Sequence, residues 1–141
     1  MRERAVEDRK IVVLVVEDNQ FFLKMQRIML ERAGFTVITA NDGQQGLDIF
    51  KQFRDELDVV VTDLMMPRLN GLELCRRIRE QKPATPVVLV TGAGEEVEPG
   101  SGGFDAAMRK PFDPRDLVEV VKQLASLTPR ERRERQAAHG E

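Results

Sequence analysis

The sequence predicts an α/β fold with three layers, in which helices cover both faces of a doubly wound, five-stranded parallel sheet. Short β-branched runs alternate along the chain with amphipathic stretches, which is typical of strand–helix units around a parallel sheet. Residues 11–16 (IVVLVV) are apolar throughout, as expected of a strand that is covered on both faces. Right-handed connections between parallel strands leave few topologies for such a chain.

A helix, a strand and a second helix are predicted after the first strand. Apolar residues recur at helical spacing over residues 19–33, and Gly34 then supplies the left-handed cap that ends such a helix. Residues 35–39 are predicted to be the second strand and residues 43–53 the second helix. The apolar residues at helical spacing are Phe22, Met25, Met29 and Ala33 in the first helix, and Leu47 and Phe50 face inward in the second.

The second half of the chain continues the alternation. Residues 57–62 (LDVVVT) are the expected third strand, residues 71–81 the third helix and residues 87–90 the fourth strand. The last helix has a clear start, because Asp113 can cap it and Pro114 suits its first turn. The inward positions are expected to be Leu74, Cys75 and Ile78 in the third helix and Leu117, Val120, Val121 and Leu124 in the last.

The fourth helix is the weak element of the prediction. Residues 92–103 (GAGEEVEPGSGG) contain five glycines and a proline, and both residue types disfavour helix. We therefore expect a short or irregular fourth helix with real mobility. The fifth strand, around residues 105–108, has few β-branched residues.

Length and composition indicate one domain, with 41% hydrophobic and 33% charged residues among 141. We expect a charged tail at 1–9, the domain at 10–127 and a charged extension at 128–141. No apolar run approaches the roughly 20 residues of a membrane span, and the charged N-terminus is unlike a secretory signal. Cys75 is the one cysteine, and the net charge of −2 gives no broad attraction to nucleic acid. A cytoplasmic location is expected.

Polar residues follow the predicted strands at their carboxyl ends, where ligands bind in sheets of this kind. Glu17 and Asp18 follow the first strand, Asp63 the third, Thr91 the fourth and Lys110 the fifth. Each alone has a simple structural explanation, such as a helix cap, a turn or a solvated lysine. Together, three crowded carboxylates repel one another unless a cation neutralises them, and oxygen ligands favour Mg²⁺.

Carboxylates, a lysine and a hydroxyl at one edge of the sheet are suited to phosphoryl transfer, which needs positioning and charge neutralisation. Lys110 suits one phosphoryl oxygen and Thr91 another. An aspartate is a competent nucleophile that forms an aspartyl phosphate. Because the acidic pair is occupied with the metal, Asp63 is the predicted phosphoacceptor.

Four segments resemble, in order, the motifs of the response-regulator receiver domains of two-component signalling. They are VLVVEDN at 13–19, VVVTDLMMPRLNG at 59–71, VTGA at 90–93 and RKPF at 109–112. The resemblance extends over roughly residues 10–127. It implies a flavodoxin-like sheet with strand order 2-1-3-4-5 and a cis bond before Pro111.

The resemblance also implies a role for each site residue. Asp63 is expected to be phosphorylated by a phosphohistidine on a sensor histidine kinase or a histidine phosphotransfer protein. Asp18 is expected to bind Mg²⁺ directly, Glu17 to bind it through water, and the backbone carbonyl of Met65 to be a further ligand. The chain would be a phosphoacceptor rather than an enzyme that turns over external substrates.

For the phosphoryl group, the resemblance implies contacts from Thr91 and Lys110, with Gly92 leaving room for its entry. Two departures from the family pattern concern how phosphorylation would be passed on to another protein or domain. Ala107 stands where receivers usually have an aromatic residue, and the segment between Thr91 and Lys110 is shorter than usual. We therefore hypothesise that ordering of the segment after Thr91 replaces an aromatic rotation. The expected output is a change in contacts with a downstream protein target or a missing output domain, without membrane or direct nucleic-acid binding.

Three alternatives remain. A nucleotide-binding enzyme is indicated by G-x-G at residues 92–94, although Val97 replaces the third glycine of the dinucleotide motif. An aspartate-based phosphatase would need a proton donor two residues after Asp63, where the chain has Met65. A receiver-like binding module that is not phosphorylated would keep the fold alone.

Overall fold

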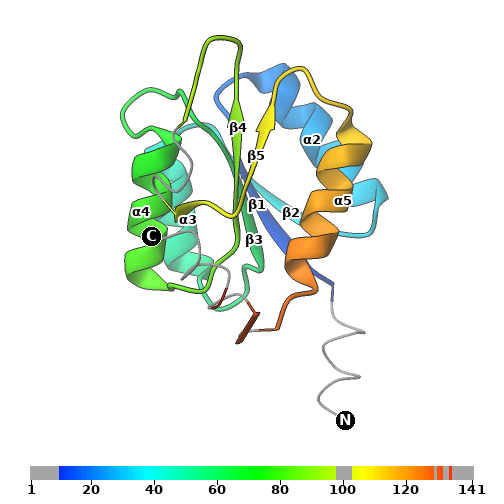
Figure 1. The fold of residues 1–141 in the computed structure, drawn as a ribbon, viewed down its shortest axis with the longest axis vertical. Coiled ribbons are helices and arrows are strands. Elements are labelled where there is room, and N and C mark those ends of the chain that lie inside the picture. The colour runs from blue at the N-terminus through cyan, green and yellow to red at the C-terminus, as the bar shows by residue number, and fades with distance from the viewer. Residues whose placement is uncertain (1–9, 98–102, 129, 132–133, 135–141) are drawn as a thin grey trace.

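The structure, a computed structural model, describes residues 10–97, 103–128, 130, 131 and 134. Five parallel strands form one sheet in the order β2-β1-β3-β4-β5, between two pairs of helices (Figure 1). The predicted fold class and strand order are confirmed. With the labels of Figure 1, the elements are β1 (Val12–Val16), α2 (Gln20–Arg32), β2 (Thr36–Ala40), α3 (Gly43–Phe53), β3 (Val59–Asp63), α4 (Gly71–Gln81), β4 (Val87–Thr91), β5 (Ala106–Arg109) and α5 (Pro114–Ala125).

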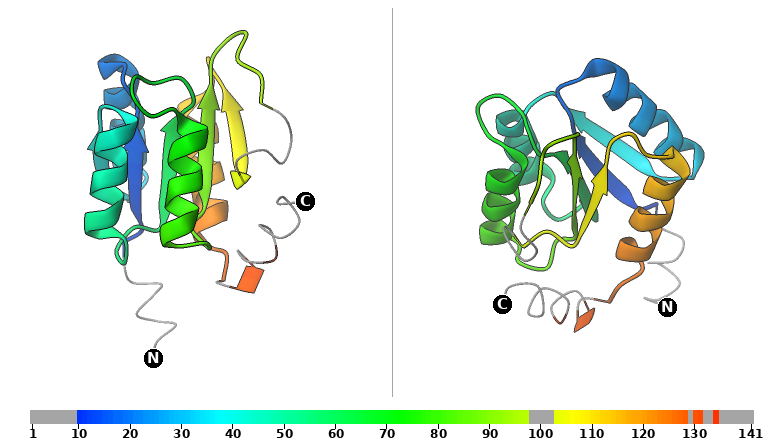
Figure 2. Two further views of the ribbon diagram at one scale, coloured as in Figure 1. Left: turned by 90° about the vertical axis from the view of Figure 1, so that its left-hand side faces the viewer. Right: turned by 45° about the horizontal axis from the view of Figure 1, so that its top comes forward.

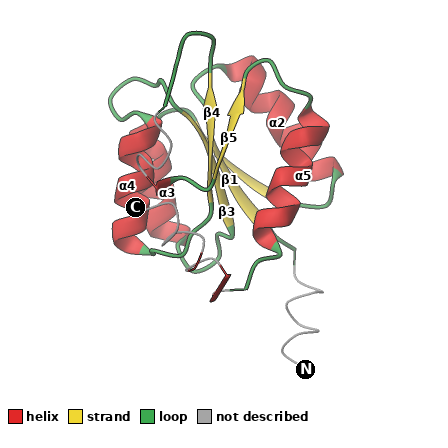
Figure 3. Ribbon diagram, in the orientation of Figure 1, coloured by secondary structure: helices red, strands yellow, loops and turns green. Residues whose placement is uncertain are grey.

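The sheet is the middle of three layers. Helices α3 and α4 lie on one face, and α2 and α5 lie on the other (Figures 1 and 2). Two hydrophobic cores result, one under each pair of helices. All five residues of β3 and all five of β4 are buried, as expected of central parallel strands (Figure 3).

The strand register brings the carboxyl ends of the central strands together. Val16 at the end of β1 pairs with Thr62 of β3, and Asp63 pairs with Val90 of β4. The side chains that follow β1 and end β3 therefore meet at one edge of the sheet. Helix α3 packs closely beneath β1, because a Cβ on Gly46 would lie 2.8 Å from the Val16 side chain.

Most predicted elements are confirmed. Helices α3 and α4 have the predicted bounds, and each strand lies within two residues of its prediction. Gly34 has φ of +100°, the left-handed conformation that its position after α2 required. The inward residues predicted for α3 and α4 are buried. In α5, Leu117, Val121 and Leu124 are buried and Val120 is partly buried.

The predicted apolar stripe of α2 is not its buried face. The buried residues are Leu23, Gln26 and Leu30, each one position from the predicted set. Met25 is 40% exposed. Apolar residues on this helix occupy overlapping faces, so spacing alone did not identify the side that packs on the sheet.

The connection between β4 and β5 contains no α-helix in its described part. Residues 92–97 form a turn followed by irregular backbone, and Gly94 has φ of +79°. Residues 98–102, which include the rest of the predicted short or irregular helix, lie outside the described residues. Strand β5 is half-exposed, and Ala107 faces solvent.

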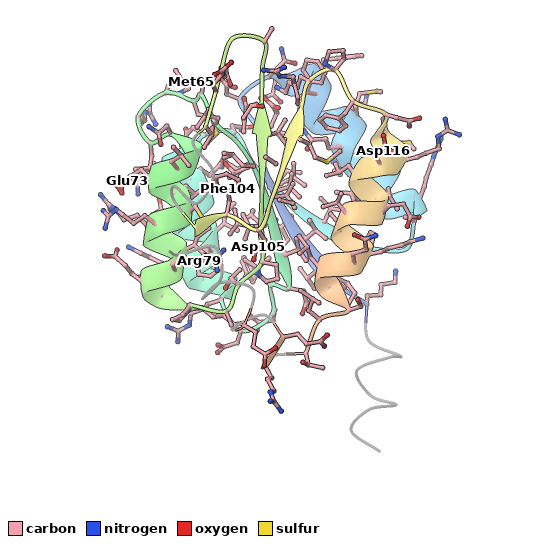
Figure 4. All side chains as sticks on the ribbon, in the orientation of Figure 1. Met65, Glu73, Arg79, Phe104, Asp105 and Asp116 are labelled. Carbon is pink, nitrogen blue, oxygen red and sulfur yellow. The ribbon has the colours of Figure 1, made fainter. Side chains whose placement is uncertain are left out.

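An ion pair joins α4 to the start of β5 where a covering helix was expected. Arg79 on α4 lies 2.7 Å from an Asp105 oxygen, and the two side chains approach each other in Figure 4. The same oxygen of Asp105 accepts a hydrogen bond from the backbone N–H of Val87 at 2.8 Å. Arg79 also donates to the backbone carbonyls of Gly103 and Pro83. Side-chain contacts therefore fix where β5 begins.

The predicted tail at 1–9, and the predicted extension apart from residues 128, 130, 131 and 134, lie outside the described residues. Among the helices that the structure describes, none combines the length and the apolar character that a bilayer crossing requires.

Candidate functional site

Three carboxylates gather at the carboxyl edge of the sheet. Glu17 and Asp18 follow β1 and Asp63 ends β3, and one oxygen from each lies within 4.8 Å of the others. Glu17 is 1% exposed and Asp63 8%, whereas Asp18 faces solvent. The sequence prediction that these residues converge is confirmed by their positions.

Glu17 is fixed by contacts at both carboxylate oxygens. One oxygen accepts a hydrogen bond from the backbone N–H of Asn19 at 3.1 Å. The other lies 2.8 Å from the ammonium of Lys110. Its own backbone N–H donates to the carbonyl of Ala40 at the end of β2. Asp18 is the more open of the acidic pair and thus the more accessible to a cation.

Lys110 extends from the end of β5 into the cluster. Its ammonium lies 3.6 Å from an Asp63 oxygen, in addition to its contact with Glu17. Its backbone N–H donates to the carbonyl of Thr91 at 2.7 Å, which places the start of the lysine side chain beside β4. The bond between Lys110 and Pro111 is cis, as the sequence resemblance implied.

The surroundings of Asp63 give its carboxyl group an unusually high pKa. Its burial, and then the neighbouring Glu17 carboxylate, raise its pKa from 3.8 to about 7, against the lowering effect of Lys110. Burial would lower the pKa of Lys110, but its contacts with Glu17 and Asp63 outweigh this, and the net change is upward. The site thus contains more negative charge than its one lysine neutralises, which favours an additional cation.

Thr91 ends β4 beside this cluster and is 7% exposed. Its hydroxyl lies 3.5 Å from the backbone carbonyl of Met108. The next residue, Gly92, donates its backbone N–H to the side chain of Glu95 at 2.8 Å, and Glu95 donates its N–H to the Gly92 carbonyl. This reciprocal pair resembles a helix capping box, although no α-helix follows in residues 93–97.

The loop from β3 to α4 fixes the backbone of Asp63. A Cβ on Gly71 would lie 2.3 Å from the Asp63 carbonyl oxygen, so only glycine fits at the start of α4. Gly71 also donates its N–H to the carbonyl of Leu64. Met65 lies on this loop with its side chain 58% exposed, at the carboxyl end of the sheet (Figure 4).

The donor set fits a hard divalent cation. All side-chain donors are carboxylate oxygens, which suit Mg²⁺ and do not suit a metal that prefers sulfur or nitrogen. Asp18 and Asp63 are placed to hold it, with Glu17 behind them. Burial first, and then repulsion from Glu17, raise the pKa of Asp63, and a bound cation would offset both effects by stabilising the charged carboxylate.

Two contacts of the site were not predicted from the sequence. The ring of Phe22 lies 4.4 Å from the ammonium of Lys110, although Phe22 had been assigned to the apolar stripe of its helix. Glu95 reaches the N–H of Gly92, although its segment had been considered only for its weak helix propensity. Glu95 stands three residues after Gly92, which is the spacing of a capping box, but glycine replaces the serine or threonine of that motif, so the sequence carries no clear signal for this contact.

Comparison with known proteins shows which family the chain belongs to. A family model described as "Response regulator receiver domain" matches residues 13–122. The chain is 37% identical over 115 residues to the alkaline phosphatase synthesis transcriptional regulatory protein PhoP of Bacillus subtilis, covering 79% of this chain and 47% of that protein. It is 34% identical over 120 residues to the response regulator ArlR of Staphylococcus aureus, covering 83% and 53%. The chain thus matches about half the length of these relatives.

A solved structure agrees with the sequence comparisons. A response regulator receiver domain protein from Clostridium thermocellum superposes with a TM-score of 0.78 at 30% identity, covering 82% of this chain and 94% of that one. The strand order, the converging site residues and the family match agree. The chain belongs to the response regulator receiver domain family, the receiver component of two-component signalling.

Proposed function

We propose that Asp63 is the phosphoacceptor, and that it receives its phosphoryl group from a phosphohistidine of a sensor histidine kinase or histidine phosphotransfer protein. The observation that supports this most strongly is the position of Asp63 at the end of β3, buried beside the Lys110 ammonium and two further carboxylates. Nucleophilic attack by an Asp63 oxygen forms the P–O bond as the P–N bond to histidine breaks, and the electron pair leaves on the imidazole nitrogen.

Mg²⁺ would be held by Asp18 and Asp63, by Glu17 through water, and by the backbone carbonyl of Met65. When bound, it supplies positive charge against the carboxylates and the phosphoryl oxygens. Lys110 is placed to meet a second phosphoryl oxygen with its ammonium, because it already lies 3.6 Å from Asp63. Further donors are the Thr91 hydroxyl at the end of the neighbouring strand β4 and the N–H of Gly92, once it is released from Glu95.

The aspartyl phosphate is returned to carboxylate by water, which releases phosphate. Met65 has no proton to donate at the position where an aspartate-based phosphatase needs one, so the site is a store of the phosphoryl group rather than a hydrolase. The dinucleotide alternative requires a helix that starts at the glycine-rich turn, and described residues 92–97 form none.

The phosphorylated domain is proposed to signal through contacts with a downstream protein target or an output domain beyond this chain. Ala107 has no ring, so ordering of the segment that begins at Gly92 replaces an aromatic rotation. In the unphosphorylated domain the N–H of Gly92 is held by the Glu95 side chain of the same segment, and a phosphoryl oxygen on Asp63 would replace that contact with one anchored to the sheet. Amide exchange should slow across residues 92–97 on adding beryllofluoride and Mg²⁺. Equal exchange in both states would contradict this switch.

The phosphoacceptor assignment is tested with acetyl phosphate and Mg²⁺, followed by intact mass measurement. The chain is expected to gain one acid-labile phosphoryl group, and Asp63→Asn is expected to abolish it. Asp48→Asn is the matched control, because Asp48 is an exposed aspartate on α3 away from the cluster. Peptide mapping that places the label on Asp18 or Asp48 would refute the assignment. Failure of the wild type to gain any label would favour the non-phosphorylated binding module.

A further inference from the structure

Phe22 is the aromatic residue that contacts the site. It lies in the first turn of α2, where the side chain of Asn19 accepts a hydrogen bond from the Phe22 N–H at 3.1 Å. This cap fixes the backbone from which the ring extends. The ring centroid lies 4.4 Å from the ammonium of Lys110, well inside the range of an attractive cation–π contact.

The ring has little part in the hydrophobic core. Among the described residues, the side chains packed against either core do not include Phe22, whereas Met29 of the same helix is among them. The ring of Phe21 meets it edge to face at 5.9 Å, and Phe21 is itself 63% exposed. Core packing therefore does not explain why a large aromatic ring stands at this position.

Glu17 draws the Lys110 ammonium toward the acidic pair, and a second, uncharged partner can hold it at the mouth of the site instead. The charged neighbours of Lys110 are Glu17 at 2.8 Å and Asp63 at 3.6 Å, both of them carboxylates. Phosphorylation converts the Asp63 carboxylate into a mixed anhydride and places the negative charge on the phosphoryl oxygens, so the contact of Lys110 with Asp63 changes when the domain is phosphorylated. The face of a phenyl ring keeps the same quadrupole throughout.

We propose that Phe22 is a positioning residue that holds the Lys110 ammonium at the mouth of the site through its ring face. This inference rests on the proposed role of Lys110 toward the phosphoryl group. The lysine side chain has four rotatable bonds, and with the ring beneath it fewer of its rotamers compete with the one that meets the phosphoryl oxygen. Phe22 acts on the phosphoryl group only through Lys110.

The test measures beryllofluoride affinity in the presence of Mg²⁺ for wild type, Phe22→Leu and Phe22→Tyr. Leucine keeps an apolar, helix-compatible side chain without a ring, and tyrosine keeps the ring. Phe22→Leu is expected to weaken binding about three- to ten-fold, and Phe22→Tyr to retain it. Met25→Leu, an exposed change on the same helix, is the control and should have no effect.

A Lys110→Ala background separates positioning from a structural role. If the ring acts through the lysine, Phe22→Leu should cause no further loss of affinity in Lys110→Ala. An equal loss in both backgrounds, equal affinity of Phe22→Leu and wild type, or equal losses for the leucine and tyrosine variants would each overturn the proposal.

A second readout needs no ligand. In the wild type, the protons on Cε of Lys110 should show an upfield ring-current shift that disappears in Phe22→Leu and persists in Phe22→Tyr. Absence of that shift in the wild type would also overturn the proposal. If instead the phosphoacceptor assignment is wrong, wild type and every variant will fail to bind beryllofluoride while the ring-current shift remains, so the two failures are distinguishable.

Discussion

Replacing Asp63 by asparagine should stabilise the metal-free protein at neutral to alkaline pH. The wild type holds a buried carboxyl group whose pKa is raised to about 7 by burial and by Glu17. Above that pH the folded chain has to hold a charge that it disfavours, whereas Asp63→Asn removes the charge and keeps the size of the side chain. The variant therefore gains stability while losing the carboxylate that we propose as the phosphoacceptor.

The pKa of 3.8 raised to about 7 sets an upper limit for the gain. A change of one pKa unit is worth about 1.4 kcal/mol, so the charge costs at most about 4 kcal/mol. The asparagine variant also loses the attraction of Asp63 for Lys110 at 3.6 Å, which reduces the net gain. We expect about 2 kcal/mol, which corresponds to a rise in Tm of roughly 8 °C for a domain of this size.

The pH dependence follows from proton binding. Between pH 3.8 and about 7, Asp63 binds a proton in the folded chain and not in the unfolded chain. The free energy of unfolding of the wild type therefore falls as pH rises through this window, and that of Asp63→Asn lacks this contribution. The difference in free energy of unfolding between Asp63→Asn and the wild type should be small near pH 4 and largest at pH 8.

Thermal unfolding followed by circular dichroism in EDTA at pH 4 to 8 provides the measurement, because the chain has no tryptophan or tyrosine for fluorescence. Asp48→Asn controls for the loss of one surface charge. Mg²⁺ should raise the Tm of the wild type more than that of Asp63→Asn. The electrostatic explanation would be refuted if Asp63→Asn raised the Tm equally at pH 4 and pH 8. It would also be refuted if Asp48→Asn raised the Tm by the same amount.

Three further predictions concern the metal, the glycine beside the site and the ion pair at the sheet edge. Asp18→Ala should weaken Mg²⁺ binding in calorimetry more than Glu17→Ala, because Asp18 is open while both oxygens of Glu17 are engaged; equal effects would contradict this. Gly71→Ala should cost about 1–3 kcal/mol of stability and slow the proposed phosphorylation of Asp63, since its Cβ would displace the Asp63 backbone carbonyl; a normal phosphorylation rate would contradict it. Arg79→Ala should cost about 3 kcal/mol in urea unfolding by removing the 2.7 Å ion pair with the buried Asp105 carboxylate, whereas a loss below about 1 kcal/mol would mean the pair is weak.

Patterns that are local in the chain predicted most of the fold. The bounds of helices α3 and α4 are predicted correctly because apolar residues mark one face of each, and the structure adds that Asp42 and Asn70 cap their first turns. The face of α2 was misplaced because Phe22 and Met25 are apolar without being buried, while the polar Gln26 is buried and donates to its own helix. Hydrophobicity and burial differ at such residues, and only packing decides between them.

The site residues were predicted because each follows a strand, and the parallel sheet brings strand ends together. The contact of Phe22 with Lys110 joins the first helix to the last strand, and no spacing in the sequence encodes it. The Arg79–Asp105 pair escaped prediction for the same reason. Contacts of this kind depend on the rotamers of long side chains in the folded chain.

The segment that joins two neighbouring strands usually both connects them and sets their register. Here the pairing of Arg79 with Asp105 sets the register of β5. Asp105 binds the start of β4 through the Val87 N–H, so the register of β5 is set from outside the connecting segment. The placement of Lys110 beside Asp63 therefore depends on contacts at the opposite end of β5 as well as on the carboxylates of the site itself.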